Sequence, residues 1–245
     1  RRFFDAHDLV QRPSVRWMID FGVNMPEAEA AHYALPFEHV RQKVYPVRQK
    51  APRRAYRERW WIHGEARPGL RQAIRGLSRV LCTSRVAKHR VFVWLPADIV
   101  ISSAVYAFAR DDDYFFGVLH SFLHEVWSLR MGTSLGETPR YTPTTTFETF
   151  PLPYPPGAEP TESADYRAIA AAAAELHRVR EAWLNPPELS GSPQALKDRT
   201  LTNLYNAVDA YRTNSVAVRI PKAAREIAPH IAALHDALDG AVQCV

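Results

Sequence analysis

The feature that most constrains this chain is a proline-rich segment a little past its middle. Residues 132–160 contain seven prolines and the run Thr-Pro-Thr-Thr-Thr at 142–146. Proline cannot continue an α-helix, because it lacks the backbone N–H and its ring clashes with the preceding turn. We therefore expect an ordered loop followed by a linker here. The boundary divides the 245 residues into one unit over 1–155 and a second over 156–245.

The two sides of this segment differ in periodicity. Short β-type runs and helix-like stretches precede it, whereas alanine-rich stretches with leucines at helical spacing follow it. We expect an α+β fold, in which a mixed α/β domain with a small sheet precedes a unit of three helices. The expected strands cover 16–21, 80–83, 91–95 and 104–109. The expected helices run from 26 toward 35, over 37–50, from 68, and over 114–131, 164–184, 194–214 and 221–242.

Charge is distributed unevenly, although the formal net charge is only +5. Residues 1–110 carry 20 basic and 9 acidic side chains, a net of +11, and residues 111–245 carry 11 and 17, a net of −6. Within 41–90, arginines outnumber lysines twelve to three. Because the planar guanidinium suits bidentate contacts to phosphate and guanine, this bias favours a nucleic-acid partner. The alternative is an ordinary solvated face.

Composition also disfavours several classes of protein. Cys82 and Cys244 are the two cysteines, too few for a disulfide framework or a cysteine-rich zinc site. No apolar run approaches the roughly 18 residues that a membrane span needs, and no signal peptide opens the chain. We expect a cytoplasmic protein without membrane contact. Because the chain opens on Arg1 instead of methionine, we take it to be a fragment.

Four apparent catalytic signals have simpler explanations. The run Asn-Pro-Pro-Glu at 185–188 has a glutamate where a methyltransferase turn needs an aromatic residue to stack on the flipped base. His120 and His124 have a metal-ligand spacing but no third ligand, so we expect partly buried, hydrogen-bonded histidines. Asp-Phe-Gly at 20–22 lacks the companion motifs of a kinase, and the aspartates at 111–113 are typical of a helix start. No Gly-rich phosphate loop is present, so we expect no catalytic residue, metal or cofactor in this segment.

Several longer segments carry a family resemblance. The most specific is Arg-Tyr-Thr-Pro-Thr-Thr-Thr-Phe-Glu-Thr-Phe-Pro at 140–151. With the segments 16–23, 56–68, 83–95, 112–121 and 127–153, it resembles the target recognition region of MmeI-like restriction-modification enzymes, which are adenine-specific DNA methyltransferases often fused to an endonuclease. Residues 199–206 and 235–242 resemble the helical C-terminal unit of that family. The resemblance implies a module that recognises a double-stranded DNA sequence, with a methyltransferase domain that binds S-adenosylmethionine upstream of Arg1.

Contacts to phosphate set the register of such a module without reading sequence. Our candidates are basic or small polar residues: Arg53, Arg54, Arg57, Arg59, Ser84, Arg85, Lys88 and Arg90. Their alternative role is to keep a surface solvated. We expect Trp60 and Trp61 to pack in the interior, since readers of duplex DNA rarely need stacking platforms.

Base readout needs side chains that present donors and acceptors to base edges, such as arginine to guanine and glutamate to cytosine. The loop after the helix that ends at Gly132 combines both kinds. Our candidates are Arg130, Ser134, Glu137, Arg140, Tyr141 and Thr142. Alternatively, Glu137 and Arg140 form an exposed ion pair that fixes the loop.

Three hypotheses remain open. The first is the DNA sequence-recognition module of a site-specific N6-adenine methyltransferase, whose partners are double-stranded DNA and the upstream methyltransferase domain. The second is a general nucleic-acid-binding domain, for which the basic stretch alone would suffice. The third is a scaffold unit whose acidic helical part docks on the methyltransferase.

Overall fold

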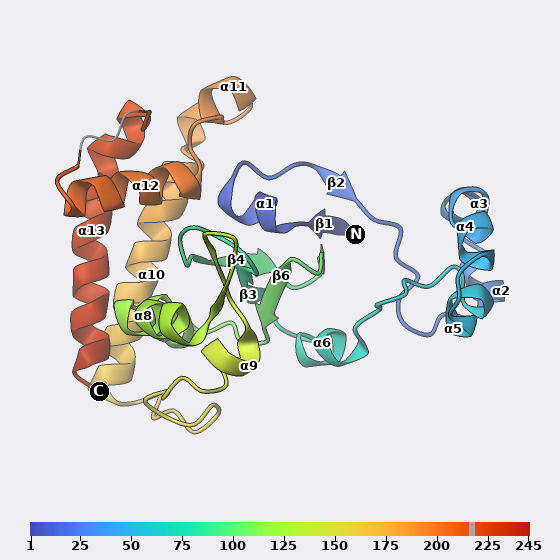
Figure 1. Cartoon of the computed structure of the whole chain (residues 1–245), viewed down its shortest axis with the longest axis horizontal. Coiled ribbons are helices and arrows are strands. Elements are labelled where there is room, and N and C mark those ends of the chain that lie inside the picture. The colour runs from blue at the N-terminus through green and yellow to red at the C-terminus, as the bar shows by residue number, and fades with distance from the viewer. Residues whose placement is uncertain (216–218) are drawn as a thin grey trace.

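The computed structural model describes residues 1–215 and 219–245. Its body contains small sheets with the C-terminal helices on one side, and a lobe of short helices stands apart on the other side (Figure 1). Extended stretches of chain join the lobe to the body (Figure 1). Within the described residues, no helix is long and apolar enough to cross a membrane.

The central sheet has the strand order β4-β3-β6. Strand β3 (Arg79–Ser84) pairs antiparallel with β4 (Phe92–Pro96) and with β6 (Val105–Phe108). Leu81, in the middle of β3, lies opposite Trp94 and Phe108. All of β3 after Arg79 is buried, as expected for a strand covered on both faces. The three strands predicted in this part of the chain are confirmed.

A second sheet, β2-β1-β5, lies beside it and consists of β1 (Arg2–Phe4), β2 (Arg16–Trp17) and β5 (Val100–Ile101). Helix α1 (Ala6–Val10) follows β1. The strand predicted over 16–21 is wrong beyond Trp17. The chain leaves the sheet there and carries Phe21 into the lobe, where its side chain is buried.

The helix predicted over 114–131 is in fact two helices, α7 (Asp113–His120) and α8 (Phe122–Met131). Ser121 separates them in an extended conformation and caps α8, its hydroxyl accepting from the His124 N–H at 3.4 Å. Serine competes for backbone hydrogen bonds and so favours a cap over a helix interior. Asp112 caps α7 by accepting from the Phe115 N–H at 2.8 Å, which confirms that the aspartates begin a helix.

The C-terminal unit contains α10 (Ala164–Leu184), α12 (Leu201–Arg212) and α13 (Lys222–Gln243). Gly117 lets α7 cross close to two of these helices, because a Cβ there would lie 2.8 Å from Ile169 and 3.1 Å from Leu238. The first and third predicted helices are confirmed. The second begins at Leu201 instead of 194, because Thr200 caps it and the short α11 (Pro193–Leu196) is separate. The predicted α+β class is confirmed.

Two hydrophobic cores hold the described residues together. The larger contains residues from both sides of position 155, for example Phe116 and Leu204, so packing is continuous across the predicted boundary, which stays a prediction. The lobe has its own core, formed by Phe21, Ala30, Val40, Trp60 and Ile62. Burial of Trp60 confirms its predicted packing role. The lobe helices are α2 (Glu27–Ala30), α3 (Ala34–Lys43), α4 (Tyr45–Gln49) and α5 (Arg54–Glu58), and α6 (Pro68–Ala73) follows them.

A buried polar network joins the central sheet to the C-terminal helices. The Arg180 side chain is fully buried on α10 and donates to the Phe92 carbonyl of β4 at 2.8 Å and to His120 Nε2 at 2.8 Å. The Tyr205 hydroxyl lies 2.9 Å from Nε2 of both His120 and His235. Burial, followed by the charge of Arg180, holds the pKa of His120 well below its ordinary value and lowers that of His235 to about 3.

This network predicts that the protein loses stability in mild acid. The unfolded chain protonates these histidines below about pH 6.5, whereas the folded state keeps them neutral. Stability should be complete above pH 7 and fall as the pH drops from 6.5 toward 3. Urea unfolding at pH 7 and pH 5 should differ by roughly 1–2 kcal/mol for each buried histidine. His230→Gln, at an exposed position on α13, should leave this difference unchanged, while His235→Gln should reduce it. Equal unfolding free energies at the two pH values would contradict the argument.

Candidate nucleic-acid interface

The segment that contains three of the six predicted base-reading residues is a β-hairpin. Strands β7 (Thr133–Leu135) and β8 (Thr138–Arg140) pair antiparallel around the two-residue turn at 136–137. Gly136 has φ +60°, which suits a glycine in the first position of a type II′ turn. The ordered loop expected here is therefore a regular hairpin at 133–140, followed by the short helix α9 (Pro143–Thr146). Pro139 is compatible with this strand because β8 is short and its Pro139 position needs no ladder donor.

The hairpin is attached to the turn that follows β3. Val86 forms an isolated antiparallel bridge with Arg140. The Tyr141 N–H donates to the Arg85 carbonyl at 2.8 Å, and the Ala87 N–H donates to the Pro139 carbonyl at 3.2 Å. These contacts unite two sets of predicted residues, the phosphate candidates at 84–90 and the base-reading candidates at 130–142. We call residues 85–89 and 133–140 together the composite surface.

Three of the predicted residues, Tyr141, Arg90 and Ser84, lie next to this surface but are packed inside the molecule. Tyr141 is 1% exposed, and its hydroxyl lies 3.0 Å from His124 Nε2. The buried Arg90 side chain donates to the Thr83 hydroxyl at 3.1 Å, and its guanidinium lies 4.9 Å from the centre of the Tyr141 ring. Burial lowers the pKa of Arg90 to about 10. Tyr141 and Arg90 therefore support the hairpin from the interior of the protein.

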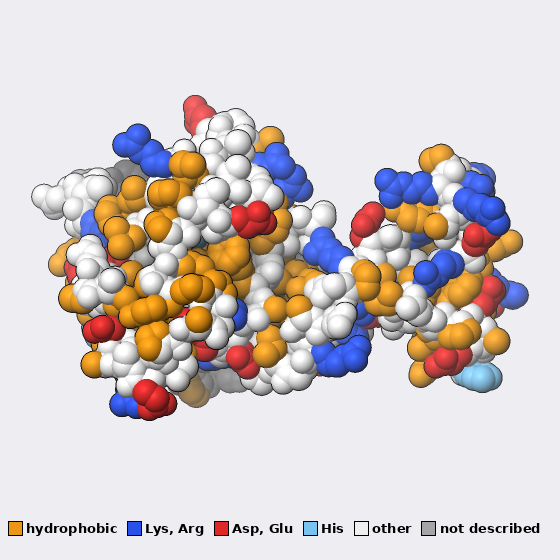
Figure 2. Space-filling model, turned by 90° about the horizontal axis from the view of Figure 1, so that it is seen from below, with side chains coloured by type: hydrophobic (Ala, Val, Ile, Leu, Met, Phe, Trp, Pro, Cys, Tyr) orange, Lys and Arg blue, Asp and Glu red, His pale blue; other side chains and the backbone are white. Residues whose placement is uncertain are grey.

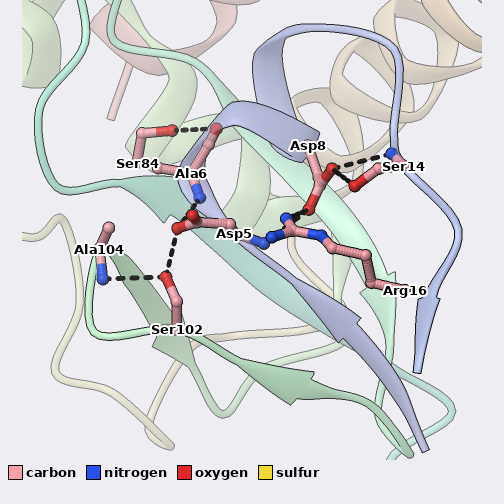
Figure 3. Close-up of polar contacts among 8 residues, drawn as sticks. All are labelled: Asp5, Ala6, Asp8, Ser14, Arg16, Ser84, Ser102 and Ala104. Atoms are coloured by element: carbon pink, nitrogen blue, oxygen red, sulfur yellow. Dashed lines mark hydrogen bonds and ion pairs between the residues drawn. The ribbon is translucent and has the colours of Figure 1, made fainter. Parts of the chain in front are cut away.

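Ser84 is also buried, and it faces the first helix. Its hydroxyl donates to the Ala6 carbonyl at 3.2 Å (Figure 3). In the same close-up, Asp5 accepts from the Ser102 hydroxyl and from the Ala6 N–H, which fixes the start of α1 against the loop before β6 (Figure 3). Ser84 thus ties the end of β3 to α1, and its hydroxyl does not face solvent in this arrangement.

The remaining candidates of the composite surface and its flanks are accessible. Arg130, Ser134, Glu137 and Lys88 are exposed, and Arg85, Arg140 and Thr142 are half-buried. Within the described residues, Glu137 and Arg140 form no ion pair with each other, which disfavours the alternative that an ion pair fixes the loop. The Arg140 Nε atom is buried and has no hydrogen-bond partner. That atom is out of reach of solvent, so any contact that Arg140 makes with a ligand has to use its Nη atoms, which no hydrogen bond or ion pair engages within the described residues.

The four arginines at 53–59 lie in the lobe, away from the composite surface (Figure 1). Contacts within the lobe already engage their side chains. Arg53 lies 3.6 Å from Glu65, and Arg54 lies 2.6 Å from Glu58. Arg57 donates to the Ala51 and Pro52 carbonyls at 2.6 and 3.0 Å, and Arg59 bonds the Val23 carbonyl and Asn24. The structure does not bring these four residues together with the reading candidates.

A cleft of about 490 Å³ lies between the lobe and the body and is lined by Arg1, Arg71 and Arg75. Lys and Arg side chains appear on both sides of the narrow waist between the two parts (Figure 2). Asp20 is buried beneath the cleft and binds Arg71 through two contacts of 2.8 and 3.0 Å. The Asp-Phe-Gly run at 20–22 is thus part of a structural ion pair. Arg75 is exposed, and no motif in the sequence distinguishes it from the other arginines.

The Asn-Pro-Pro-Glu run does not fit a methyltransferase site. The Asn185 amide oxygen accepts from Arg12 at 3.0 Å, and its amide nitrogen donates to Glu181 at 3.1 Å, so both polar atoms are engaged. The run continues into a 3₁₀ turn at Pro187–Leu189 after α10. Within the described part of the chain, no group of three or more His, Cys, Asp or Glu residues could hold a metal ion. The predicted hydrogen bonding of His120 and His124 is confirmed, and both side chains are more deeply buried than predicted.

Comparisons with known proteins bear on this surface. A family model described as the target recognition domain of MmeI matches residues 1–154. A solved structure of the type IIL restriction-modification enzyme MmeI in complex with DNA is similar to this chain, with a TM-score of 0.66 and 20% sequence identity. The similarity covers 100% of this chain and 28% of that chain, so this chain spans less than a third of the enzyme's length. No curated protein sequence matches the chain.

Proposed function

The chain belongs to the MmeI target recognition domain family, and we propose that it is the module that recognises a double-stranded DNA sequence in a site-specific N6-adenine methyltransferase of the restriction-modification type. The observation that carries this proposal is the composite surface. A two-stranded β-ribbon is narrow enough to enter the DNA major groove. Here such a ribbon carries Ser134, Glu137 and Arg140 and lies beside the turn that carries Lys88, so basic, acidic and neutral hydrogen-bonding side chains are brought together.

The mixture of charges favours sequence recognition over general nucleic-acid binding. A general binder needs positive charge along the phosphate backbone and gains nothing from an exposed carboxylate. Glu137 lies at the tip of the hairpin, where an acidic side chain repels phosphate but can accept from the amino group of cytosine. The rigid support from Arg90 and Tyr141 also suits discrimination, because a reading group has to be held in place.

We predict that the chain binds duplex DNA with an affinity that falls steeply with salt. About five to eight phosphate contacts would give a slope of roughly −4.5 to −7 in a plot of log K against log salt. Fluorescence anisotropy with duplex and single-stranded oligonucleotides of the same sequence, repeated at several salt concentrations, measures the affinity and its salt dependence. Arg75→Glu should reduce the affinity and the slope, whereas Arg225→Glu, exposed on α13, should change neither. Preference for the single strand, or a slope near zero, would contradict the proposal.

We predict that the hairpin sets the base preference. Glu137→Gln or Arg140→Gln should relax the preference at one position, since one base contact contributes about 1–3 kcal/mol of discrimination. Selection from randomised duplexes followed by sequencing measures the preference. Tyr141→Phe removes the hydroxyl that bonds His124, so it should cost about 1–3 kcal/mol of stability without altering the selected sequence. If both hairpin variants select the same sequence as the wild type, the hairpin is structural.

We also propose that a methyltransferase domain of the same polypeptide covers the apolar face of α8. Phe122, Val126 and Leu129 lie on one stripe of this helix and are 51%, 40% and 52% exposed. Exposed apolar stripes mark contacts with other proteins, whereas a DNA-binding face would be basic. S-adenosylmethionine would then bind to that domain and not to this chain, and the whole enzyme would act on cytoplasmic DNA.

This proposal predicts that α8 is needed for association between the two parts. Co-purification of this chain with a separately expressed methyltransferase domain should be abolished by Leu129→Glu combined with Val126→Glu, because each carboxylate would be buried without a partner. Leu35→Glu, at a position 86% exposed in the lobe, is the matched control and should leave the association intact. Association that survives the α8 changes would place the contact elsewhere.

A further inference from the structure

One residue of the C-terminal helical unit contacts the composite surface directly. The Asn206 side-chain oxygen, on α12, lies 2.6 Å from Lys88 Nζ and 2.9 Å from His89 Nε2. The lysine ammonium has only donors, so the atom that faces it has to be the amide oxygen. His89 Nδ1 in turn lies 3.6 Å from a carboxylate oxygen of Asp209, one helical turn further along α12. Because Nε2 donates to Asn206 and burial lowers the pKa of His89, the neutral ring has no proton on Nδ1 to donate to Asp209. Asn206 is therefore the residue of α12 that holds the turn at 85–89.

This contact orders a side chain that is ordinarily mobile. A free lysine has a long flexible stem and about 2 kcal/mol of rotamer entropy, so it suits any nearby phosphate. Here Asn206 holds the Lys88 ammonium in place, and the largely buried His89 beside it restricts the motion of the turn at 85–89. Binding Asn206 uses one of the three N–H donors of Lys88 and leaves two. Two fixed donors match the two acceptors, O6 and N7, that guanine presents in the major groove.

The position of Lys88 relative to the hairpin supports a reading role. Val86 bridges Arg140, and Ala87 bonds the Pro139 carbonyl, so Lys88 follows the last residue that is paired to β8. A base pair that faces the turn therefore neighbours the base pairs that face the hairpin. The sequence alone favours phosphate contact for Lys88, because the residue that anchors it lies 118 positions away.

We propose that Asn206 is a positioning residue for sequence recognition, and that it holds Lys88 so that the ammonium reads a guanine in the base pair facing the turn at 85–89. The inference rests on the proposed function, because it assumes that the composite surface lies in the major groove of duplex DNA. It assigns a part of the specificity to α12, which does not itself contact the DNA.

The test compares two substitutions of similar size at the same position. Asn206→Asp keeps an oxygen that can accept from Lys88 and His89, whereas Asn206→Leu removes it. Selection from randomised duplexes should show that Asn206→Leu loses preference for guanine at one position by about tenfold, and that Asn206→Asp retains it. Asn203→Leu is the matched control on the same helix, because the Asn203 amide bonds the Asp198 carbonyl and not the turn.

A double-mutant cycle separates positioning from general stability. Lys88→Met should lose the same guanine preference, and adding Asn206→Leu to Lys88→Met should change the preference no further. Melting temperatures of all variants are measured in parallel, so that a folding defect in Asn206→Leu is recognised and Lys88→Met and Asn206→Asp then decide the question.

Two outcomes overturn the inference. In the first, Lys88→Met selects the same sequence as the wild type and only binds every duplex more weakly, which makes Lys88 a phosphate contact. In the second, Asn206→Leu folds and retains the guanine preference. If the wild-type chain selects no sequence at all, the proposed function itself fails, and that result is distinct from both.

Discussion

The arrangement of this molecule depends on one buried guanidinium. Arg180 leaves α10 and donates to the Phe92 carbonyl of β4, to His120 of α7 and to Tyr205 of α12, all within the protein interior. Burying an arginine is unfavourable unless its donors find acceptors, so the acceptors of Nη1 and Nη2 have to lie where they do, while the buried Nε has no partner among the described residues. Burial, followed by repulsion from the charge of Arg180, lowers the pKa of His120 and His235 and keeps both neutral. One side chain thus fixes the distance and orientation between the sheet and the helical unit.

The contacts of Arg180 explain how helices far along the chain can hold the composite surface in place. Tyr205 belongs to the network around Arg180, and the next residue, Asn206, holds the turn at 85–89. The hairpin in turn bonds this turn through the Arg85 and Pro139 carbonyls. The hairpin, the turn and α12 therefore form a continuous series of contacts that leads back to the buried core. A surface supported in this way can present donors at defined positions, which discrimination between bases requires.

Local sequence patterns predicted the elements whose residues satisfy each other nearby. The three central strands, the helix starts at Asp112 and Pro68, and α10 and α13 follow from alternation, capping residues and helical spacing. The break at Ser121 did not follow, because the apolar periodicity runs through it and masks the local serine cap. The hairpin at 133–140 did not follow, because it is attached to a distant segment through the bridge of Arg140 with Val86. The two segments of the candidate site were predicted, because their residue types are visible locally in the sequence. The union of these segments and the role of Asn206 are tertiary features.

The structure also changes how the basic residues should be weighed. In the sequence, the arginines at 53–59 form the densest cluster and attract the assignment of phosphate contact. At each of the four, one guanidinium nitrogen is engaged by Glu58, Glu65 or a backbone carbonyl of the lobe, so a phosphate that binds through that nitrogen has to exchange with an internal partner. Such an exchange adds little free energy, because an exposed ion pair and an exposed phosphate contact are both screened by water. Arg75 is exposed, and within the described residues no hydrogen bond or ion pair engages its guanidinium, so it needs no such exchange. Affinity and specificity should therefore depend less on the number of arginines in a segment than on which donors the fold leaves free and holds still.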